Sequence, residues 1–234
     1  MAGAERKAVL SLRGIEKRFG LKKSIDGLDL DVCPGEFISL FGENGAGKTT
    51  LLKLLSGLQG ASSGKIETRA GILDRSRIGY ISHQVMLYSE LTGYENLALF
   101  AELHNLPDPR GTAHRMISRI NLESDAGRFV RDYSRGMMQR LSLGRALIND
   151  PELLLLDEPY TGLDRQGTEF LSGLLRGAHR EGKTVIMATH DLQQGYELAD
   201  RLVALYRGRI FLDASVKDLD FSEFTSLYDG VSGK

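Results

Sequence analysis

Cysteine is nearly absent from this sequence: Cys33 is the single one among 234 residues. One thiol cannot form an internal disulfide, and the cysteine and histidine spacing of a zinc site is missing. A disulfide framework and a structural zinc site are therefore excluded, and the lone thiol fits a reducing cytoplasm.

Long apolar runs are absent as well. The N-terminal stretch MAGAERKAVLSL has no apolar core of the kind that a secretory signal needs. No segment approaches the roughly 18 consecutive apolar residues that a membrane-spanning helix requires. We therefore expect no signal peptide and no bilayer crossing, which leaves docking on a membrane protein open.

An excess of charge is the third absence. The 30 lysines and arginines nearly balance the 31 aspartates and glutamates, for a formal net charge of −1. The basic field of a nucleic-acid-binding domain is missing, so nucleic acid is not an expected partner. What is present, 41% hydrophobic and 26% charged residues, is the composition of a globular protein with a well-buried core.

Predicted strands and helices alternate along the chain. Two runs are apolar without interruption, as in strands that are buried on both faces of a parallel sheet. Leucines from 51 to 58 recur at helical spacing, and so do apolar residues from 171 to 178. The alternation predicts an α/β fold. The predicted strands are 9–15, 36–41, 77–82, 152–157 and 184–189, followed by a hairpin over 201–215.

Residues 87–150 differ from the rest of the chain. Their strand signals are weak, and helical patterns lie on both sides of a proline-rich break at 107–111. We interpret this stretch as a helical insertion within the α/β unit.

A glycine-rich loop follows the predicted strand 36–41. It reads GENGAGKTT and matches G-x-x-x-x-G-K-[ST] at Gly42, Gly47, Lys48 and Thr49. Glycines let backbone N–H groups approach phosphate oxygens, and the start of the next helix adds partial positive charge. Lys48 is expected to reach the β- and γ-phosphates, and Thr49 to ligate Mg²⁺. A chance glycine-rich turn is the alternative, but the flanking strand and helix favour nucleotide binding.

Two adjacent carboxylates end the predicted strand 152–157. Because side chains alternate along a strand, Asp157 and Glu158 cannot play the same part. Asp157 is expected to hold Mg²⁺ through water, and Glu158 to polarise the attacking water as general base. Ordinary solvated acids are the alternative. His190 follows the strand 184–189 and is expected on the same side, because ligands bind beyond the carboxyl ends of parallel strands.

Together these residues resemble the ATP-binding subunit of ABC transporters, over about residues 8–215. Residues 42–49 are similar to the family's Walker A motif and residues 153–158 to its Walker B motif. The resemblance implies ATP and Mg²⁺ as cofactors. It also implies an α/β P-loop NTPase core with a mainly parallel sheet and an N-terminal antiparallel β subdomain. A helical subdomain, about 87–150, is then inserted in a single domain of residues 1–234.

The same resemblance assigns further site residues. Gln84 matches the Q-loop glutamine, which in the family touches Mg²⁺ and senses the membrane subunit. Asp164 falls in the D-loop, and His190 matches the switch histidine at the γ-phosphate. Phe19 stands where an aromatic ring stacks on adenine, although a core phenylalanine is the alternative. The expected catalytic residues are Lys48, Gln84, Glu158 and His190. The expected Mg²⁺ ligands are Thr49, Gln84 and Asp157. The expected nucleotide contacts are Phe19, Gly42, Glu43, Asn44, Gly45, Ala46, Gly47, Lys48, Thr49, Thr50, Ser134, Gly136 and Asp164.

The stretch DYSRGMMQR, 132–140, occupies the place of the family's signature motif, LSGGQ. Ser134 and Gly136 are kept, whereas Arg135 and Met137 replace a glycine and a glutamine. In the family, two copies pack head to tail, and each signature helix points its N-terminus at the γ-phosphate on the other copy. The bare backbone at Gly136 is expected to admit that phosphate, with a weak half-site as the alternative.

The resemblance implies a second cassette and a transmembrane permease as partners, on the cytoplasmic face of the cell membrane. Residues 87–111 are expected to form part of the docking surface. Residues 82–106 and 153–164 are also similar to the haem-exporter ATPase of cytochrome c maturation and related export ATPases, which predicts export, with haem as cargo. A soluble ATPase of iron–sulfur cluster assembly is the alternative, and a non-enzymatic binding module is a third.

Overall fold

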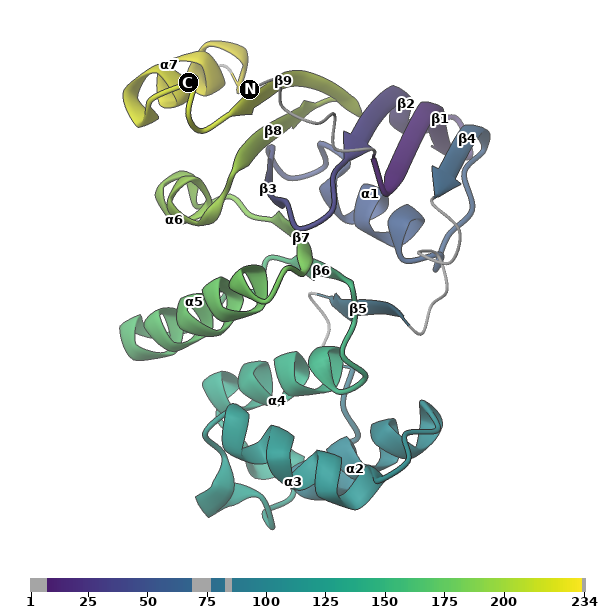
Figure 1. The fold of residues 1–234 in the computed structure, drawn as a ribbon. Helices are drawn as coiled ribbons and strands as arrows, with labels where there is room; N and C mark the ends of the chain where they lie inside the picture. Colours follow the sequence, from purple (N-terminus) through teal and green to yellow (C-terminus); the bar gives the residue numbers. More distant parts are fainter. Residues whose placement is uncertain (1–7, 69–76, 83–85, 233–234) are drawn as a thin grey trace, which may run out of the picture.

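The computed structural model describes residues 8–68, 77–82 and 86–232. Figure 1 shows a small sheet and helix α1 (Lys48–Leu55) at one end of the molecule. Three helices lie at the other end, namely α2 (Gly93–Leu103), α3 (Pro109–Arg119) and α4 (Arg135–Leu147). A large sheet runs between the two ends. In the described part of the chain, no helix combines the length and the apolar character that crossing a bilayer demands.

The large sheet is parallel except at one edge. Its strand order is β5-β6-β7-β3-β8-β9, and the β8–β9 pair at the edge is antiparallel. The predicted α/β fold with a mainly parallel sheet is therefore confirmed, as is the predicted C-terminal hairpin. The strands are β3 (Phe37–Phe41), β5 (Ile78–Ile81), β6 (Leu153–Asp157), β7 (Thr184–Ala188), β8 (Arg201–Tyr206) and β9 (Arg209–Ser215).

Both faces of the large sheet are covered, which explains its uninterrupted apolar strands. Every residue of β6 and β7 is buried. In β6, Leu154 and Leu156 join a core with α4 and with α5 (Arg165–Arg180). Leu153 and Leu155 point the other way, into a core with α1 and the small sheet. Alternate residues of one strand therefore serve two cores.

The small sheet is antiparallel throughout and matches the N-terminal unit that the resemblance implies. Its order is β2-β1-β4, with β1 over Leu10–Phe19, β2 over Lys22–Val32 and β4 over Ser63–Thr68. The strand predicted over 9–15 covers part of β1, whereas β2 and β4 were not predicted. In β2, charged residues alternate with buried apolar ones, so its apolar content is diluted.

Helix α1 is shorter than its leucine spacing predicts. It ends at Leu55, and Gly57 follows with a positive φ of 69°. Leu58, which the spacing placed on the same helix, is 53% exposed. The prediction was wrong at Leu58 because the helix has its C-cap at Ser56 and the backbone turns away at Gly57.

Helix α4 is capped at its start and attached to neighbouring elements near its end. At its start, the Ser134 hydroxyl accepts a hydrogen bond from the Met137 N–H at 3.3 Å. At its other end, the Arg145 guanidinium donates to the Tyr80 carbonyl of β5 at 2.5 Å and lies over the Phe100 ring of α2. Burial lowers the pKa of Arg145.

Helix α7 (Phe221–Ser232) was not predicted. Figure 1 shows it beside the β8–β9 edge of the large sheet. Its Phe224 is fully buried in a third core with Phe41, Leu202 and Ala204. The helix α6 (Leu192–Leu198) contributes partly buried side chains to the same core.

Candidate functional site

The loop between β3 and α1 needs glycine for two different reasons. A Cβ on Gly42 would come 2.7 Å from the Leu205 carbonyl oxygen, and one on Gly47 would come 2.7 Å from the Ser24 carbonyl oxygen. Gly45 faces open space, but its φ of +86° is a conformation that favours glycine. The loop thus packs closely on β2 and β8 while its middle stays open.

Lys48 is buried at the start of α1, directly after the loop. Its Nζ donates to the Gly42 carbonyl at 2.5 Å and lies 3.6 Å from Glu158 Oε1. A buried ammonium is costly unless it is paired, and here the partners are the loop carbonyl and the carboxylate after β6. The lysine side chain therefore joins the two predicted motifs.

Thr49 and Asp157 bring two oxygen atoms together beside the loop. The Thr49 hydroxyl donates to Asp157 Oδ1 at 3.1 Å, and Asp157 is 2% exposed. A hydroxyl and a carboxylate are the hard oxygen donors that Mg²⁺ takes, together with water and phosphate oxygens. The two residues fit such an ion. The next residue, Thr50, shares a hydrogen bond with Ser24 of β2 at 2.8 Å.

Glu158 stands at a strained position with two partners. Its φ is +51°, in the left-handed region, and its N–H donates to the Ala188 carbonyl at the end of β7. Its Oε2 lies 2.7 Å from His190 Nδ1, while its Oε1 faces Lys48. Lys48, Glu158 and His190 therefore form a continuous row along the carboxyl ends of β3, β6 and β7.

The pKa of Tyr80 in β5 depends in part on the charge of Asp157 in this site. Burial, followed by the negative charge of Asp157, raises the pKa of Tyr80 to about 12. The tyrosine thus stays neutral beside the carboxylate over the ordinary pH range.

The start of α4 lies away from the glycine-rich loop. Figure 1 shows α4 among the helices at the end of the molecule opposite α1. Among the described residues, a Cβ on Gly136 would meet nothing closer than Leu163 Cδ2, at 4.0 Å. The neighbouring Arg135 side chain lies against Gly162. Packing within the chain therefore gives no reason for glycine at 136.

Three other predicted residues have different placements. Asp164 caps α5, because its Oδ1 accepts from the Gly167 N–H at 2.7 Å. Phe19 ends β1 with its ring 49% exposed and Lys17 Nζ over it, so it is not a core residue. Gln84 lies outside the described residues.

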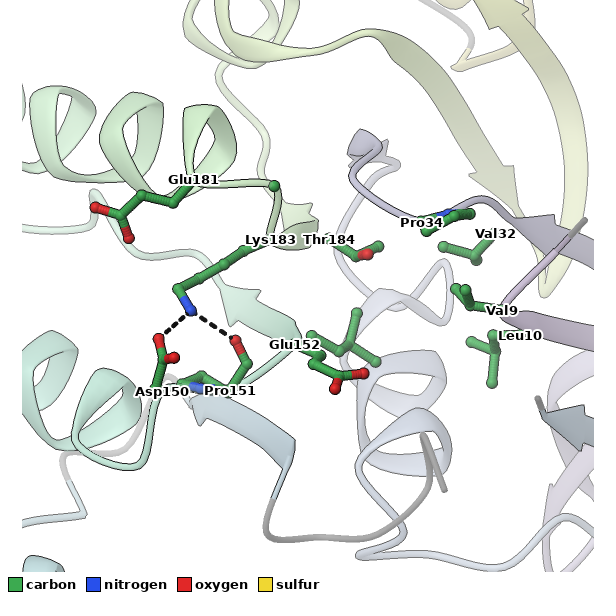
Figure 2. Close-up of a pocket in the computed structure, with 12 residues that line it drawn as sticks. Val9, Leu10, Val32, Pro34, Asp150, Pro151, Glu152, Glu181, Lys183 and Thr184 are labelled. Atoms are coloured by element: carbon green, nitrogen blue, oxygen red, sulfur yellow. Dashed lines mark hydrogen bonds and ion pairs between the residues drawn. The ribbon is translucent and has the colours of Figure 1, made fainter. Parts of the chain in front are cut away.

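A cavity of about 330 Å³ opens at the amino ends of the parallel strands, away from the glycine-rich loop. Leu153 and Thr184, which begin β6 and β7, line it, as do residues of the small sheet. In Figure 2, Lys183 points between Asp150 and the Pro151 carbonyl and bonds to both. The cavity faces the amino ends of the strands, so it is separate from the glycine-rich loop.

Tyr228 of α7 is a neighbour of the loop that the sequence motifs did not reveal. Its ring centroid lies 6.5 Å from that of Phe41, the residue that precedes Gly42. Aromatic residues at 221, 224 and 228 recur at i, i+3 and i+7, which is the spacing of one helix face and could have revealed the helix.

Comparisons with known proteins agree on one family. Residues 25–161 match the family described as ABC transporter. The daunorubicin resistance ATP-binding protein DrrA3 of Streptomyces coeruleorubidus is 39% identical over 218 residues, covering 90% of this chain and 69% of that protein. A Nod factor export ATP-binding protein I of Cupriavidus metallidurans is 36% identical over 225 residues, covering 92% of this chain and 74% of that protein.

A solved structure shares the fold. The dimeric post-hydrolysis state of the ATP-binding cassette MJ0796, bound to ADP and Pi, superposes with a TM-score of 0.80 at 26% identity. The match covers 88% of this chain and 98% of that one.

Proposed function

The chain belongs to the ABC transporter family, and we propose that two such cassettes close head to tail around ATP to drive a separate transmembrane permease. The chain is an ATPase, the ATP-binding subunit of a transporter. The observation that carries the proposal is the row of Lys48, Glu158 and His190 beside an open glycine-rich loop.

The loop and Lys48 bind the phosphates in this proposal. Backbone N–H groups of residues 42–50 and the positive start of α1 attract phosphate oxygens. The Lys48 ammonium is already held at the loop by the Gly42 carbonyl, so little ordering remains to be done when ATP enters. Phe19 offers its exposed ring to the adenine from the adjacent β1–β2 hairpin.

Glu158 is the general base in this proposal. Its carboxylate accepts a proton from water as the water oxygen bonds to the γ-phosphorus, and the bond to the bridging oxygen breaks to release ADP. His190 holds that carboxylate through the 2.7 Å contact with Oε2. Thr49 and Asp157 would hold Mg²⁺, with Gln84 as a further proposed ligand. When bound, Mg²⁺ supplies charge neutralisation at the phosphates.

The signature residues act on the other copy. Helix α4, which begins next to Ser134, lies at the end of the molecule opposite α1. Among the described residues, the only neighbour that a Cβ on Gly136 would meet within 4 Å is Leu163. A second cassette placed head to tail offers its γ-phosphate to this helix start, where the dipole and free N–H groups favour an anion. Asp164, next to this start across Leu163, is proposed to border the same interface.

Replacing Glu158 by glutamine tests both the base and the closed dimer. The E158Q variant is expected to bind ATP, to lose turnover by a factor of about a hundred or more, and to elute as a dimer in size-exclusion chromatography with ATP. Glu169, an exposed acid on α5, provides the control. E169Q is expected to behave as the wild type.

Two outcomes would contradict this proposal. An E158Q variant that hydrolyses ATP at the wild-type rate would show that Glu158 is not the general base. An E158Q variant that binds ATP but stays monomeric at high protein concentration would contradict the proposed head-to-tail dimer.

We further propose a peripheral position on the cytoplasmic face of a membrane, with the helical segment 87–150 acting as one inserted subdomain within a single domain. Export is the proposed direction, in line with the Nod factor export relative. Haem as cargo stays a prediction, because none of the named relatives carries haem in its name. The transport names also favour a transporter over an iron–sulfur assembly ATPase.

Cargo and direction are tested together. A pull-down from native membranes identifies the permease, and reconstitution of both subunits in vesicles measures which way cargo moves. An aliphatic sulfonates import ATP-binding protein is also similar to this chain, so accumulation of cargo on the cassette side would replace export by import.

A further inference from the structure

The backbone at Glu158 is held in an unusual conformation. Its φ of +51° lies in the left-handed region, which a residue other than glycine keeps only where the surrounding structure holds it. The Glu158 N–H donates to the Ala188 carbonyl at 2.9 Å, and the Glu158 carbonyl accepts from the Thr161 N–H at 3.2 Å. The carboxylate that contacts Lys48 and His190 therefore extends from a backbone that is strained and tethered.

Residues 158–161 form a turn, closed by the bond from Thr161 to Glu158, with proline at its second position. Proline restricts its own φ to about −65°. The rotation that remains between the Glu158 and Pro159 carbonyls is therefore ψ at Pro159, and a partner that holds the Pro159 carbonyl fixes that rotation. Pro159 is buried, so its carbonyl needs a donor from the protein.

Gln139 of α4 supplies such a donor. Its Nε2 donates to the Pro159 carbonyl at 2.7 Å, and the glutamine is half-buried. The bond joins α4 to the turn that follows β6 and begins with Glu158. A residue that belongs to none of the predicted site motifs thus contacts the backbone one residue beyond the proposed base.

We propose that Gln139 is a positioning residue for the general base: its amide fixes the Pro159 carbonyl, and with it the turn from which the Glu158 carboxylate extends. The inference rests on the proposed role of Glu158. Helix α4 begins next to Ser134, so one helix carries the residues proposed to face the other copy's phosphate and the amide that steadies this copy's base.

The position of α4 rests on other contacts. Its start is capped by Ser134, and the Arg140 guanidinium carbon lies 4.4 Å from the centroid of the Phe170 ring on α5. Its buried apolar side chains pack in one core with β6 and α5. Methionine has nearly the length of glutamine but no N–H group, so Q139M removes the donor and leaves the helix in place.

The first experiment compares Q139M with Y196F in the full chain. Tyr196 of α6 donates its hydroxyl to the Leu219 carbonyl at 3.0 Å, so both variants lose one side-chain bond to a backbone carbonyl. Calorimetry measures the Kd for MgADP, steady-state assays measure KM and kcat for ATP, and thermal melting measures stability. Q139M is expected to lower kcat about threefold to tenfold, the range that one hydrogen bond spans, with Kd and KM within about twofold. Y196F is expected to lower the melting temperature and to keep kcat.

A double-mutant cycle then shows whether the amide acts through Glu158. If it does, adding Q139M to E158Q changes the residual turnover of E158Q by less than about twofold, because the carboxylate that the amide positions is already gone. The double variant is also expected to elute as a dimer with ATP, as proposed for E158Q, because Ser134 and Gly136 are unchanged.

Each other outcome overturns the inference. An unchanged kcat in Q139M would leave the amide with a structural role only. An equal fall of kcat in Y196F would assign the effect to a general loss of stability. The same fall in the E158Q background as in the wild type would show that Gln139 acts independently of Glu158. Loss of the dimer in the double variant would place Gln139 in the contact between copies. Wild-type turnover by E158Q would contradict the proposed function itself, and the cycle shows this separately.

Discussion

Two buried lysines lie at opposite ends of the parallel strands of the large sheet. Lys48 follows β3 at the carboxyl edge and bonds the Gly42 carbonyl beside Glu158. Lys183 precedes β7 at the amino edge and bonds Asp150 and the Pro151 carbonyl. Both side chains are less than one-tenth exposed. Because the two lysines are buried to the same extent, they differ in the chemical groups around them.

This pair gives a matched prediction for nucleotide affinity. K48A is expected to raise the Kd for ATP about tenfold or more, because hydrogen bonds to charged groups contribute about 1.5–3 kcal/mol each. K183A is expected to leave that Kd unchanged and to destabilise the fold by about 1–3 kcal/mol, since the Pro151 carbonyl loses its donor. Calorimetry and thermal melting measure the two effects. Equal loss of affinity in both variants would show that Lys48 has no special role.

Residue types at the site could be read from the sequence because the spacing of a glycine-rich loop is specific. The row from Lys48 through Glu158 to His190 could not be read in that way, because it depends on the register of β3, β6 and β7. The packing of Tyr228 against Phe41 was also out of reach, since 187 positions separate the two residues and α7 itself was missed. The roles of the site residues stay predictions.

At the scale of elements, the start of α4 offers a sharp test of the closed dimer. A Cβ on Gly136 would stand 4.0 Å from Leu163 Cδ2, which is ordinary van der Waals contact, and the φ of Gly136 is not positive. G136A is therefore expected to leave the melting temperature unchanged or raise it, because alanine favours helix by up to about 1 kcal/mol. The ATPase rate is expected to fall at least tenfold, since the new methyl group meets the partner's phosphate.

Gly173 of α5 supplies the control for this substitution. It also lies inside a helix, and a methyl group added there would meet open space. G173A is expected to stabilise the protein by a similar amount, about 1 kcal/mol or less, and to keep full activity. Normal hydrolysis by G136A would mean that the signature motif has been assigned to the wrong helix.

Elements with uniform apolar runs were predictable, whereas mixed ones were not. The strands β6 and β7 are buried on both faces, so their sequences read as strands without any tertiary knowledge. Strand β2 carries charges on its outer face, and most of the α7 residues between 221 and 231 are exposed. The apolar residues of β2 are too few to give a clear periodic pattern, and packing partners distant in the sequence decide its structure. In α7, the aromatic residues at 221, 224 and 228 were the signal of a helix face, and it was missed.

At the scale of the whole molecule, exposed apolar residues on the helical segment mark the proposed docking surface. Leu103 at the end of α2 is 62% exposed, and Tyr88 is 52% exposed. L103D is expected to lower the amount of permease recovered with the cassette from native membranes, because a charge prevents burial at the contact. The ATPase rate of the isolated cassette is expected to stay the same.

Leu58 provides the matched control, with 53% exposure just after α1 and outside the helical segment. L58D is expected to recover as much permease as the wild type. Equal losses in both variants would indicate a general effect of added charge, and no loss in L103D would move the docking surface elsewhere.

The attachment of α4 to β5 and α2 through Arg145 has a mechanical consequence. Its 13 residues make a rod about 20 Å long, with Ser134 at one end and the bond from Arg145 to the Tyr80 carbonyl at the other. Breaking that bond would leave the partly buried Arg145 guanidinium without its carbonyl partner, so the junction resists sliding. If a neighbouring molecule tilts the helix at residue 134, α4 moves as a rigid body and displaces β5 and α2. A small movement at the helix start is then transmitted about 20 Å, to the surface of the helical segment.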